Sequence, residues 1–247
     1  MPLFSPRKKT QKKQDISCTA VIAAAGSSSR MGAEDKLFID IHGIPVLAHT
    51  LMAFENCVYI SEIIIVAREQ SIQLIGDICS SYNIDKASQI VFGGETRLHS
   101  VLNGVLAVSD SAEIIAIHDG ARPCISTEII ERTIESAKKY HAAAPAVPVS
   151  STLKRVKSDY ILETVDRDSL FEVQTPQVFD ADLIKAALSN AKNKSIGVTD
   201  DCQAVEIIGA TVRIIEGSRL NIKLTTPEDI AIAQAILKGA EATQKES

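Results

Sequence analysis

The chain has 247 residues, of which 45% are hydrophobic and 23% charged, and its 26 Lys and Arg against 31 Asp and Glu give a formal net charge of −5. This composition excludes an intrinsically disordered, collagen-like or coiled-coil chain and is typical of a globular, enzyme-sized protein. The longest apolar runs are strand-sized, well below the ~20 residues of a transmembrane helix. We therefore expect a cytoplasmic protein that does not enter a membrane.

Basic residues gather at the N-terminus, where no hydrophobic stretch follows the segment from Arg7 to Lys13, so it does not resemble a secretory signal. We expect residues 1 to 17 to form a disordered basic tail ahead of a single domain over residues 18 to 240. The chain after the tail is acidic, which argues against nucleic-acid binding. The 5 cysteines form no C-x-x-C pair, so we expect reduced, structural thiols.

Short β-branched runs alternate with longer segments of helical periodicity. The expected strands are residues 19 to 25, 62 to 67, 89 to 92, 113 to 117 and 144 to 149, and the expected helices lie near 45 to 55, 69 to 82, 96 to 109 and 126 to 141. A last helix is expected after Thr226 and Pro227, which suit an N-cap and a first turn. This alternation predicts an α/β fold with a doubly wound, mostly parallel, Rossmann-like sheet.

Residues 150 to 168 interrupt the alternation. Two extended runs flank Lys157, Ser158 and Asp159, which predicts a β-hairpin. The hairpin has too few apolar residues for a core of its own, so we expect a protruding arm that packs on a partner surface. A second copy of the chain is the favoured partner, and an arm folded back on its own subunit is the alternative.

The candidate site lies at the carboxyl ends of the strands, where ligands bind in a doubly wound sheet. The first strand runs into Ala24, Ala25 and Gly26, followed by Arg30 and Lys36. Small residues let backbone N–H groups approach a phosphate, and the two cations add positive charge. Neither a Walker A nor a G-x-G-x-x-G pattern is present. The composition alone therefore leaves two interpretations, an anion-binding loop or an ordinary connector between a strand and a helix.

Two further segments belong to the same edge of the sheet. The fourth strand is followed by Asp119, whose carboxylate could hold a divalent ion against phosphate oxygens or merely cap a loop, and Arg122 could point back into the same cleft. We expect His118 to face the packed side. The turn from Gly93 to Ser100 runs into a helix with free N-terminal amides, which could read the edge of a base or only start the helix.

With these loops placed, residues 18 to 237 resemble the 2-C-methyl-D-erythritol 4-phosphate cytidylyltransferase family of the non-mevalonate isoprenoid pathway. The matching segments occur in the order AAGSSSRMG, GGETRLHSV, HDGARP, TLKRV, TVDRDSLFEVQTPQ, TDD and EGSRLNIKLTTPED. The resemblance implies a CTP-dependent nucleotidyltransferase that transfers CMP to methylerythritol phosphate and releases pyrophosphate, with Mg2+ as cofactor. It also implies a homodimer in which the arm clasps the neighbouring subunit.

The resemblance further implies roles for individual residues. Arg30 and Lys36 match the catalytic pair that stabilises the transition state, and Asp119 matches the carboxylate at the nucleotide and the metal. Arg167 and Lys223 match the catalytic residues that position the sugar phosphate. The surfaces that hold cytosine and triphosphate match Ala24, Ala25, Gly26, Gly94, Glu95 and Ser100. Other substrate-binding positions match Arg122, Thr152, Thr175 and Thr199, and Thr152 and Arg167 would serve the other protomer's site.

One position departs from the family's pattern. Related enzymes often carry a polar or acidic residue just before the Asn-Ile-Lys segment, but Leu220 stands there in this chain. The metal would then rest on Asp119 and substrate oxygens alone.

Two alternatives compete with this interpretation. A ribitol-5-phosphate cytidylyltransferase would share the fold and the nucleotide, but the Ala-Ala-Gly opening, the segment from Thr152 to Val156 and the segment from Thr164 to Arg167 resemble the methylerythritol enzyme. A non-catalytic CTP-binding module would not need the cationic pair, yet Arg30 and Lys36 are both present.

Overall fold

The computed structural model describes residues 16–26 and 35–245. The first 15 residues of the expected tail and Arg30 lie outside the described residues. The central sheet has eight strands, which are β1 (Cys18–Ala24), β4 (Ile60–Ala67), β5 (Ala87–Phe92), β6 (Ile114–Asp119), β7 (Ala142–Pro148), β10 (Phe171–Val173), β11 (Gln177–Asp180) and β12 (Arg213–Glu216).

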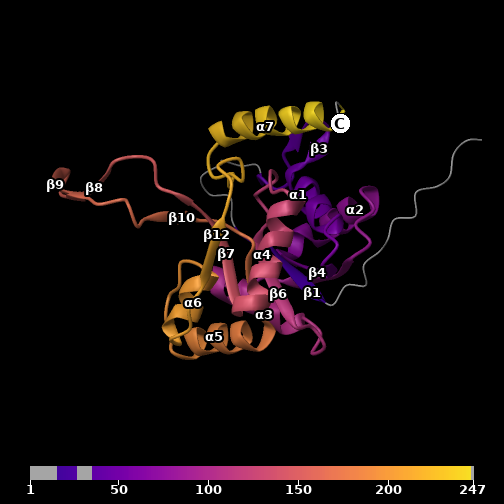
Figure 1. The fold of residues 1–247 in the computed structure, drawn as a ribbon. Coiled ribbons are helices and arrows are strands. Elements are labelled where there is room, and N and C mark those ends of the chain that lie inside the picture. The colour runs from indigo at the N-terminus through magenta and orange to yellow at the C-terminus, as the bar shows by residue number, and fades with distance from the viewer. Residues whose placement is uncertain (1–15, 27–34, 246–247) are drawn as a thin grey trace, which may run out of the picture.

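The strand order is β10-β7-β11-β6-β1-β4-β5, with β12 paired to β7 (Figure 1). Strands β5, β4, β1 and β6 run parallel to one another, whereas β11 is antiparallel to both β6 and β7. The sheet is therefore mixed but mostly parallel, which confirms the predicted fold class. Because β1 and β6 are neighbours, Ala23 and Asp119 pair at the same carboxyl edge.

Helices cover both faces of this sheet. One face is covered by α1 (Val46–Glu55), α2 (Ile72–Ser81, entered through the 3-10 turn η1, Glu69–Ser71), α4 (Thr127–Tyr140) and part of α7 (Glu228–Lys245). The other face is covered by α3 (Arg97–Ala107), α5 (Ala181–Asn193) and α6 (Asp201–Ile207). A small hairpin of β2 (Asp40–Ile41) and β3 (Ile44–Pro45) precedes α1. Among the described residues, no helix has the length and apolarity that a bilayer span requires.

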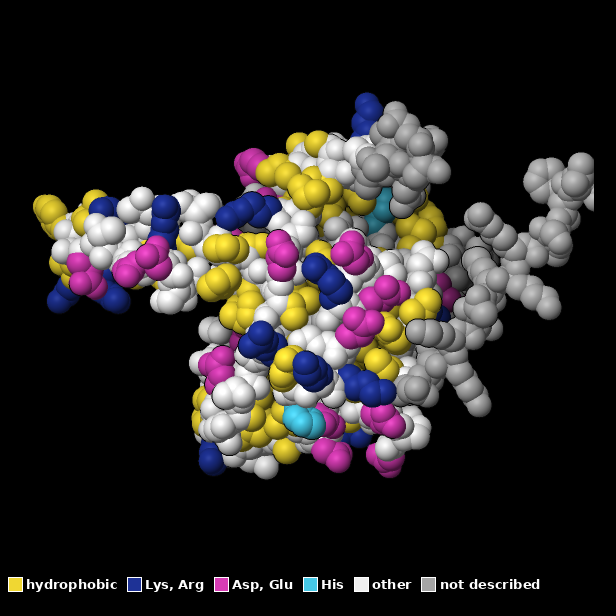
Figure 2. Space-filling model, in the orientation of Figure 1, with side chains coloured by type: hydrophobic (Ala, Val, Ile, Leu, Met, Phe, Trp, Pro, Cys, Tyr) yellow, Lys and Arg dark blue, Asp and Glu magenta, His cyan; other side chains and the backbone are white. Residues whose placement is uncertain are grey.

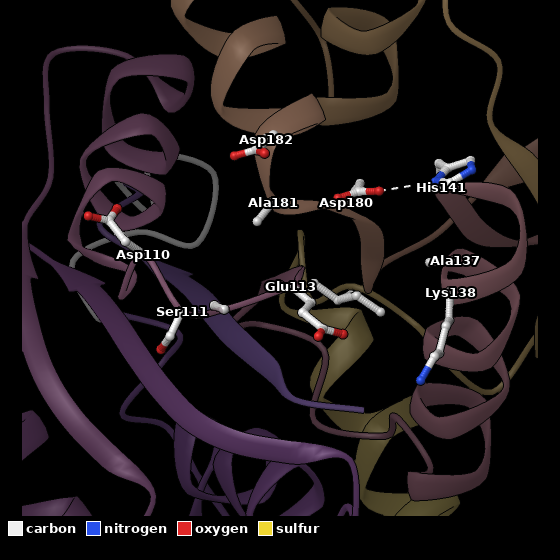
Figure 3. Close-up of a pocket in the computed structure, with 11 residues that line it drawn as sticks. Asp110, Ser111, Glu113, Ala137, Lys138, His141, Asp180, Ala181 and Asp182 are labelled. Carbon is white, nitrogen blue, oxygen red and sulfur yellow. Dashed lines mark hydrogen bonds and ion pairs between the residues drawn. The ribbon is translucent and has the colours of Figure 1, made fainter. Parts of the chain in front are cut away.

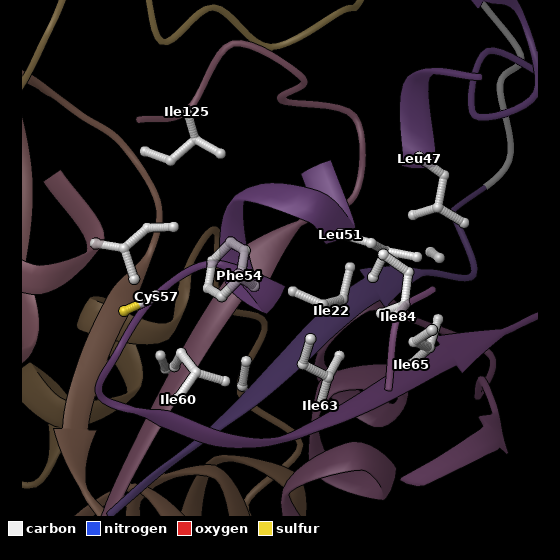
Figure 4. Packing of buried hydrophobic residues seen from close by; sticks show 14 of the residues in the cluster. Ile22, Leu47, Leu51, Phe54, Cys57, Ile60, Ile63, Ile65, Ile84 and Ile125 are labelled. Carbon is white, nitrogen blue, oxygen red and sulfur yellow. The ribbon is translucent and has the colours of Figure 1, made fainter. Parts of the chain in front are cut away.

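The alternation of side chains along the strands builds two apolar clusters. Ile22 of β1 and Ile63 of β4 join the cluster that contains Leu51 and Phe54 of α1 (Figure 4). Val21, the neighbour of Ile22, joins the cluster on the opposite face. Strands buried on both faces read as continuous apolar runs, which is why β1 and β4 were recognisable in the sequence.

Several short elements were not expected from the sequence. Strands β10, β11 and β12 have only three or four residues each, and helices α5 and α6 follow β11. A strand of three or four residues is too short to display a clear period. Strand β7 also begins two residues earlier than expected, because His141 ends α4 in the left-handed conformation, with φ at 66°.

The segment between β7 and β10 forms the predicted arm. Strands β8 (Leu153–Lys157) and β9 (Tyr160–Val165) pair with each other, and Ser158 and Asp159 turn the chain with φ values of 47° and 68°. The arm projects away from the body (Figure 1) and exposes apolar side chains near its tip (Figure 2), namely Val156, Tyr160, Ile161 and Leu162. An isolated two-stranded hairpin is marginally stable in water, so this arm needs a surface to pack on.

Candidate active site

A cavity of about 450 Å³ opens at the carboxyl edge of the sheet. It lies where β1 and β6 end, between the loop before α3 and the segment before α7. The cavity therefore brings together the small-residue loop and three of the predicted charged residues, Lys36, Asp119 and Lys223, although they are far apart in sequence. It is lined by Ala23, Ala24, Ala25, Gly26, Lys36, Leu37, Gly94, Glu95, Thr96, Arg97, Ser100, Asp119, Ala121 and Lys223.

The glycine turn after β5 packs directly on the first loop. A Cβ atom added to Gly93 would lie 2.4 Å from the Cβ of Ala25, and one added to Gly94 would lie 2.4 Å from the Cβ of His99. The Gly94 N–H donates to the Ser100 Oγ at 3.0 Å, and the Thr96 hydroxyl caps α3 by accepting from the His99 N–H at 3.2 Å. These close contacts explain why the turn carries two glycines.

Asp119 is the buried anion at the centre of the charged wall. Its Oδ2 lies 3.0 Å from Lys223 Nζ and 3.4 Å from Arg122 Nε. Burial by itself would raise the pKa of Asp119, but the charges of Lys223, Arg122 and Arg97 outweigh it and hold that pKa below its usual range. The carboxylate is therefore ionised at neutral pH.

The segment that carries Lys223 is tied to the end of β6 by several contacts. Lys36 Nζ donates to the Leu224 carbonyl at 2.7 Å, and the Leu224 N–H donates to the Ala121 carbonyl at 2.9 Å. Arg122 Nη1 donates to the Asn221 carbonyl at 2.7 Å, and buried Asn221 donates to the Thr175 carbonyl at 3.0 Å. These bonds hold Lys36 and Lys223 on the same wall as Asp119.

Thr175 and His118 support Asp119 from behind. The Thr175 hydroxyl accepts from the Asp119 N–H at 3.2 Å and lies 2.9 Å from His118 Nδ1. His118 packs against Phe54, with 4.9 Å between ring centroids, and burial lowers its pKa to about 3, so the ring is neutral at neutral pH. The expectation that His118 faces the packed side is confirmed. Thr175 is itself buried and does not line the cavity.

The remaining predicted substrate residues that the structure describes do not line the cavity. Arg122 is held behind Asp119, and Thr199 bonds to Gln203 through both its N–H and its hydroxyl. Thr152 and Arg167 are exposed at the base of the arm, where Arg167 Nη1 donates to the Ser150 carbonyl. Arg30 lies outside the described residues. A single copy of the chain therefore places Lys36, Asp119 and Lys223 together, but not Thr152 or Arg167.

Arg97 was not singled out in the sequence, yet it lines the cavity. Its two terminal nitrogens contact the carboxylate of Asp201 at 2.9 and 2.7 Å. The only signal in the sequence was the presence of both residues in conspicuous segments, GGETR and TDD, which lie too far apart along the chain to suggest a contact.

A divalent cation fits this cavity through one carboxylate. Among the described residues, no group of three or more His, Cys, Asp or Glu side chains could hold a metal on its own. Mg2+ is usually bound by one or two protein carboxylates and completes its shell with phosphate oxygens and water. Ionised Asp119 therefore suits an ion shared with a bound phosphate rather than a resident structural metal.

A second cavity, of about 470 Å³, lies at the opposite edge of the sheet (Figure 3). Its wall includes Asp110, Glu113 and Asp182, together with Asp180, which bonds to His141 at 3.0 Å. These four carboxylates outnumber the one lysine among the described lining residues, Lys138, and carboxylates repel phosphates, so this cavity does not suit an anionic substrate.

Comparison with known proteins places this chain in a family. The model of the family described as IspD, 2-C-methyl-D-erythritol 4-phosphate cytidylyltransferase, matches residues 18–239. A protein of that name from Halalkalibacterium halodurans is 46% identical over 224 residues, covering 90% of this chain and 98% of the relative. Another from Alkaliphilus oremlandii is 44% identical over 229 residues, covering 91% and 97%.

Solved structures agree with the sequence relatives. The crystal structure of 4-diphosphocytidyl-2C-methyl-D-erythritol synthase from Anaerococcus prevotii has a TM-score of 0.80 and 35% identity, and covers 90% of this chain and 96% of its own. The cytidylyltransferase from Thermus thermophilus has a TM-score of 0.75 and 29% identity, covering 88% and 98%. From its sequence and its fold alike, the chain belongs to the 2-C-methyl-D-erythritol 4-phosphate cytidylyltransferase family.

Proposed function

We propose that this chain transfers CMP from CTP to 2-C-methyl-D-erythritol 4-phosphate, giving 4-diphosphocytidyl-2-C-methyl-D-erythritol and pyrophosphate. The observation that carries the proposal is the single cavity in which Lys36, Asp119 and Lys223 meet a loop of small residues. The loop suits a triphosphate, because backbone N–H groups can approach phosphate oxygens closely where side chains are small. The cytoplasm, where CTP is available, is the proposed location.

Charge neutralisation is the main task of such a site. CTP and a sugar phosphate together bring about six negative charges at neutral pH, so the attacking oxygen must approach an already anionic phosphorus. Lys36 and Lys223, with Arg30 from the first loop, would stabilise charge on the reacting phosphoryl group. Lys223 would also position the acceptor. Because the acceptor phosphate is already ionised, the reaction needs neither a side-chain nucleophile nor a general base.

The glycine turn would hold the nucleotide base. The described loop presents the Glu95 side chain and the first turn of α3 to the cavity next to Ala25 and Gly26. Backbone and side-chain hydrogen-bonding groups fixed in this way can distinguish the edge of cytosine from that of uracil. Gly94, Glu95 and Ser100 are therefore the proposed cytosine-reading residues.

Mg2+ is the proposed cofactor, and Asp119 is the residue that would hold it. When bound, the ion would supply positive charge that offsets the repulsion between nucleotide and acceptor phosphates. Leu220, which is exposed, offers no further ligand. Lys223 and Arg122 keep Asp119 ionised and fix its position.

We further propose that the arm builds a homodimer and completes the partner's site. Exposed Thr152 and Arg167 lie at the base of an arm whose apolar tip has no core of its own. An arm that clasps a second copy would bury this tip and could bring Arg167 to the acceptor phosphate of the other protomer.

The deciding experiment measures pyrophosphate release from CTP with methylerythritol phosphate, with and without Mg2+. Release that needs both the acceptor and Mg2+ is the expected result. The same assay with ribitol 5-phosphate provides the control acceptor, and turnover of ribitol 5-phosphate alone would contradict the proposal.

A further inference from the structure

Arg97 and Asp201 form a partly buried ion pair at the edge of the cavity. The Arg97 side chain is 30% exposed and lines the cavity, whereas the Asp201 side chain is 0% exposed and is absent from the lining. Nη1 of Arg97 lies 2.9 Å from Oδ1 of Asp201, and Nη2 lies 2.7 Å from Oδ2. This two-pronged geometry is the strongest and most directional contact that a guanidinium makes with a carboxylate.

The contact holds both terminal nitrogens of Arg97. The two N–H groups that face Asp201 are not available to a phosphate, whereas the other three N–H donors of the guanidinium are. Burial by itself would lower the pKa of Arg97, but the charge and hydrogen bonds of Asp201 raise it. Arg97 therefore keeps its charge in the cavity while its position is set by a residue outside the cavity.

The Asp201 end of the pair is anchored to the central sheet. Gln177 Oε1 on β11 accepts from the N–H groups of Asp201 and Cys202 at 2.9 and 3.0 Å, and Gln177 Nε2 donates to Asp200 at 2.9 Å. Strand β11 pairs with β6, which ends at Asp119. The sheet thus fixes the position of Asp201 relative to that of Asp119.

The Arg97 end of the pair belongs to the glycine turn. Arg97 is the first residue of α3 and directly follows Gly94, Glu95 and Thr96, all of which line the cavity. A shift of Arg97 would therefore move the backbone that lines the cavity.

We propose that the Arg97–Asp201 ion pair is a positioning device that fixes the base-reading turn from Gly94 to Ser100 and so sets the preference for cytosine. The inference rests on the proposed function, in which this turn recognises the base. Asp201 acts on the nucleotide only through Arg97. The affinity for the triphosphate moiety depends on charge and is separate from this role.

The test compares full-length Arg97→Lys, Asp201→Asn and the double variant with the wild type. Both single variants keep the positive charge at the cavity, but Arg97→Lys cannot form the two-pronged contact and Asp201→Asn lacks the anion. Calorimetry with Mg2+ and no acceptor would measure the dissociation constants of CTP, UTP and inorganic pyrophosphate. The control is Arg132→Lys, whose partner Glu128 forms an exposed ion pair with it on α4.

We expect each single variant to lower the ratio of CTP to UTP affinity at least about tenfold, or about 1.4 kcal/mol. Pyrophosphate affinity should stay within about threefold of the wild type, because the charge is kept. The double variant should lose no more than the worse single variant, since the two residues act as a unit. Arg132→Lys should match the wild type, and thermal unfolding would show that each variant is folded at the temperature of measurement.

Arg97→Lys is the milder substitution, because it keeps a cation beside Asp201. An unchanged ratio of CTP to UTP affinity in this variant would overturn the proposal. A parallel fall in CTP, UTP and pyrophosphate affinity would also overturn it, because that result indicates general damage to the cavity. A wild type that binds CTP no better than UTP would overturn the proposed function as well. If the wild type and the variants all prefer CTP over UTP to the same degree, only the role of the ion pair is contradicted.

Discussion

Individual cations carry the proposed chemistry, and the structure holds two of them in one cavity. Lys36 and Lys223 come from segments nearly two hundred residues apart, yet both line one cavity. Lys36 donates to the carbonyl of Leu224, the residue after Lys223, and Lys223 contacts the carboxylate of Asp119 at the end of β6. Charges held in fixed positions need no reorganisation when the reaction begins, which is the main source of electrostatic catalysis.

Replacing Lys36 with Ala should therefore lower kcat at least about a hundredfold, or about 3 kcal/mol, because a preorganised charge is lost from the reacting phosphoryl group. Pyrophosphate release under saturating CTP and acceptor measures the effect. Lys185→Ala is the matched control, since Lys185 pairs with Asp110 at the opposite edge of the sheet. Wild-type turnover in Lys36→Ala would remove this residue from the catalytic set.

At the scale of elements, the turn before α3 and the loop after β1 pack closely against each other at the cavity. The turn before α3 can lie against the first loop only because Gly93 and Gly94 have no Cβ atom. The same packing sets the entry of α3 and so the position of Ser100, whose hydroxyl bonds to Gly94. A substitution in the turn should thus affect nucleotide binding before it affects the fold.

We expect Gly94→Ala to raise the KM for CTP roughly tenfold, since the added methyl group would meet the backbone and Cβ of His99. Gly76→Ala is the control. Gly76 lies inside α2 with no atom within 4 Å of an added Cβ, so this change should raise the free energy of unfolding by about 0.5–1 kcal/mol and leave the KM unchanged. Steady-state kinetics and urea unfolding measure the two effects, and an unaltered KM in Gly94→Ala would show that the turn does not face the nucleotide.

At the scale of the whole molecule, the arm has no role within a single copy of the chain. Its strands pair only with each other, and Arg167 at its base does not line the cavity of the same chain. In the proposed dimer each site would combine Lys36 of one protomer with an arm of the other. This arrangement predicts that two different inactive variants can restore each other.

Mixing Lys36→Ala protomers with Arg167→Ala protomers should therefore recover about one quarter of wild-type activity after subunit exchange. Half of the dimers would be mixed, and each mixed dimer would contain one site with both residues intact. Light scattering would confirm a mass of twice 26.6 kDa. If Arg167 instead served its own subunit, the mixture would stay as inactive as the separate variants.

Several features of the fold and of the candidate site could be predicted from the local sequence alone. Apolar runs identified β1 and β4 because both faces of each strand are buried, and two extended runs on either side of Ser158 and Asp159 identified the hairpin, where the structure has the turn. The small-residue loop, Asp119 and Lys223 were recognised from their segments, and the structure brings them to one cavity. These signals are local, so the order of residues along the chain is enough to reveal them.

Only the tertiary structure decided the rest. The antiparallel β11 is too short to show a period, yet it anchors Asp201 and pairs with the strand that leads to Asp119. The contact between Arg97 and Asp201 joins residues 104 positions apart, and the support of Asp119 by Thr175 spans 56 positions. Such contacts depend on how the chain packs in space, because burial, bond geometry and charge pairing arise only once distant segments meet.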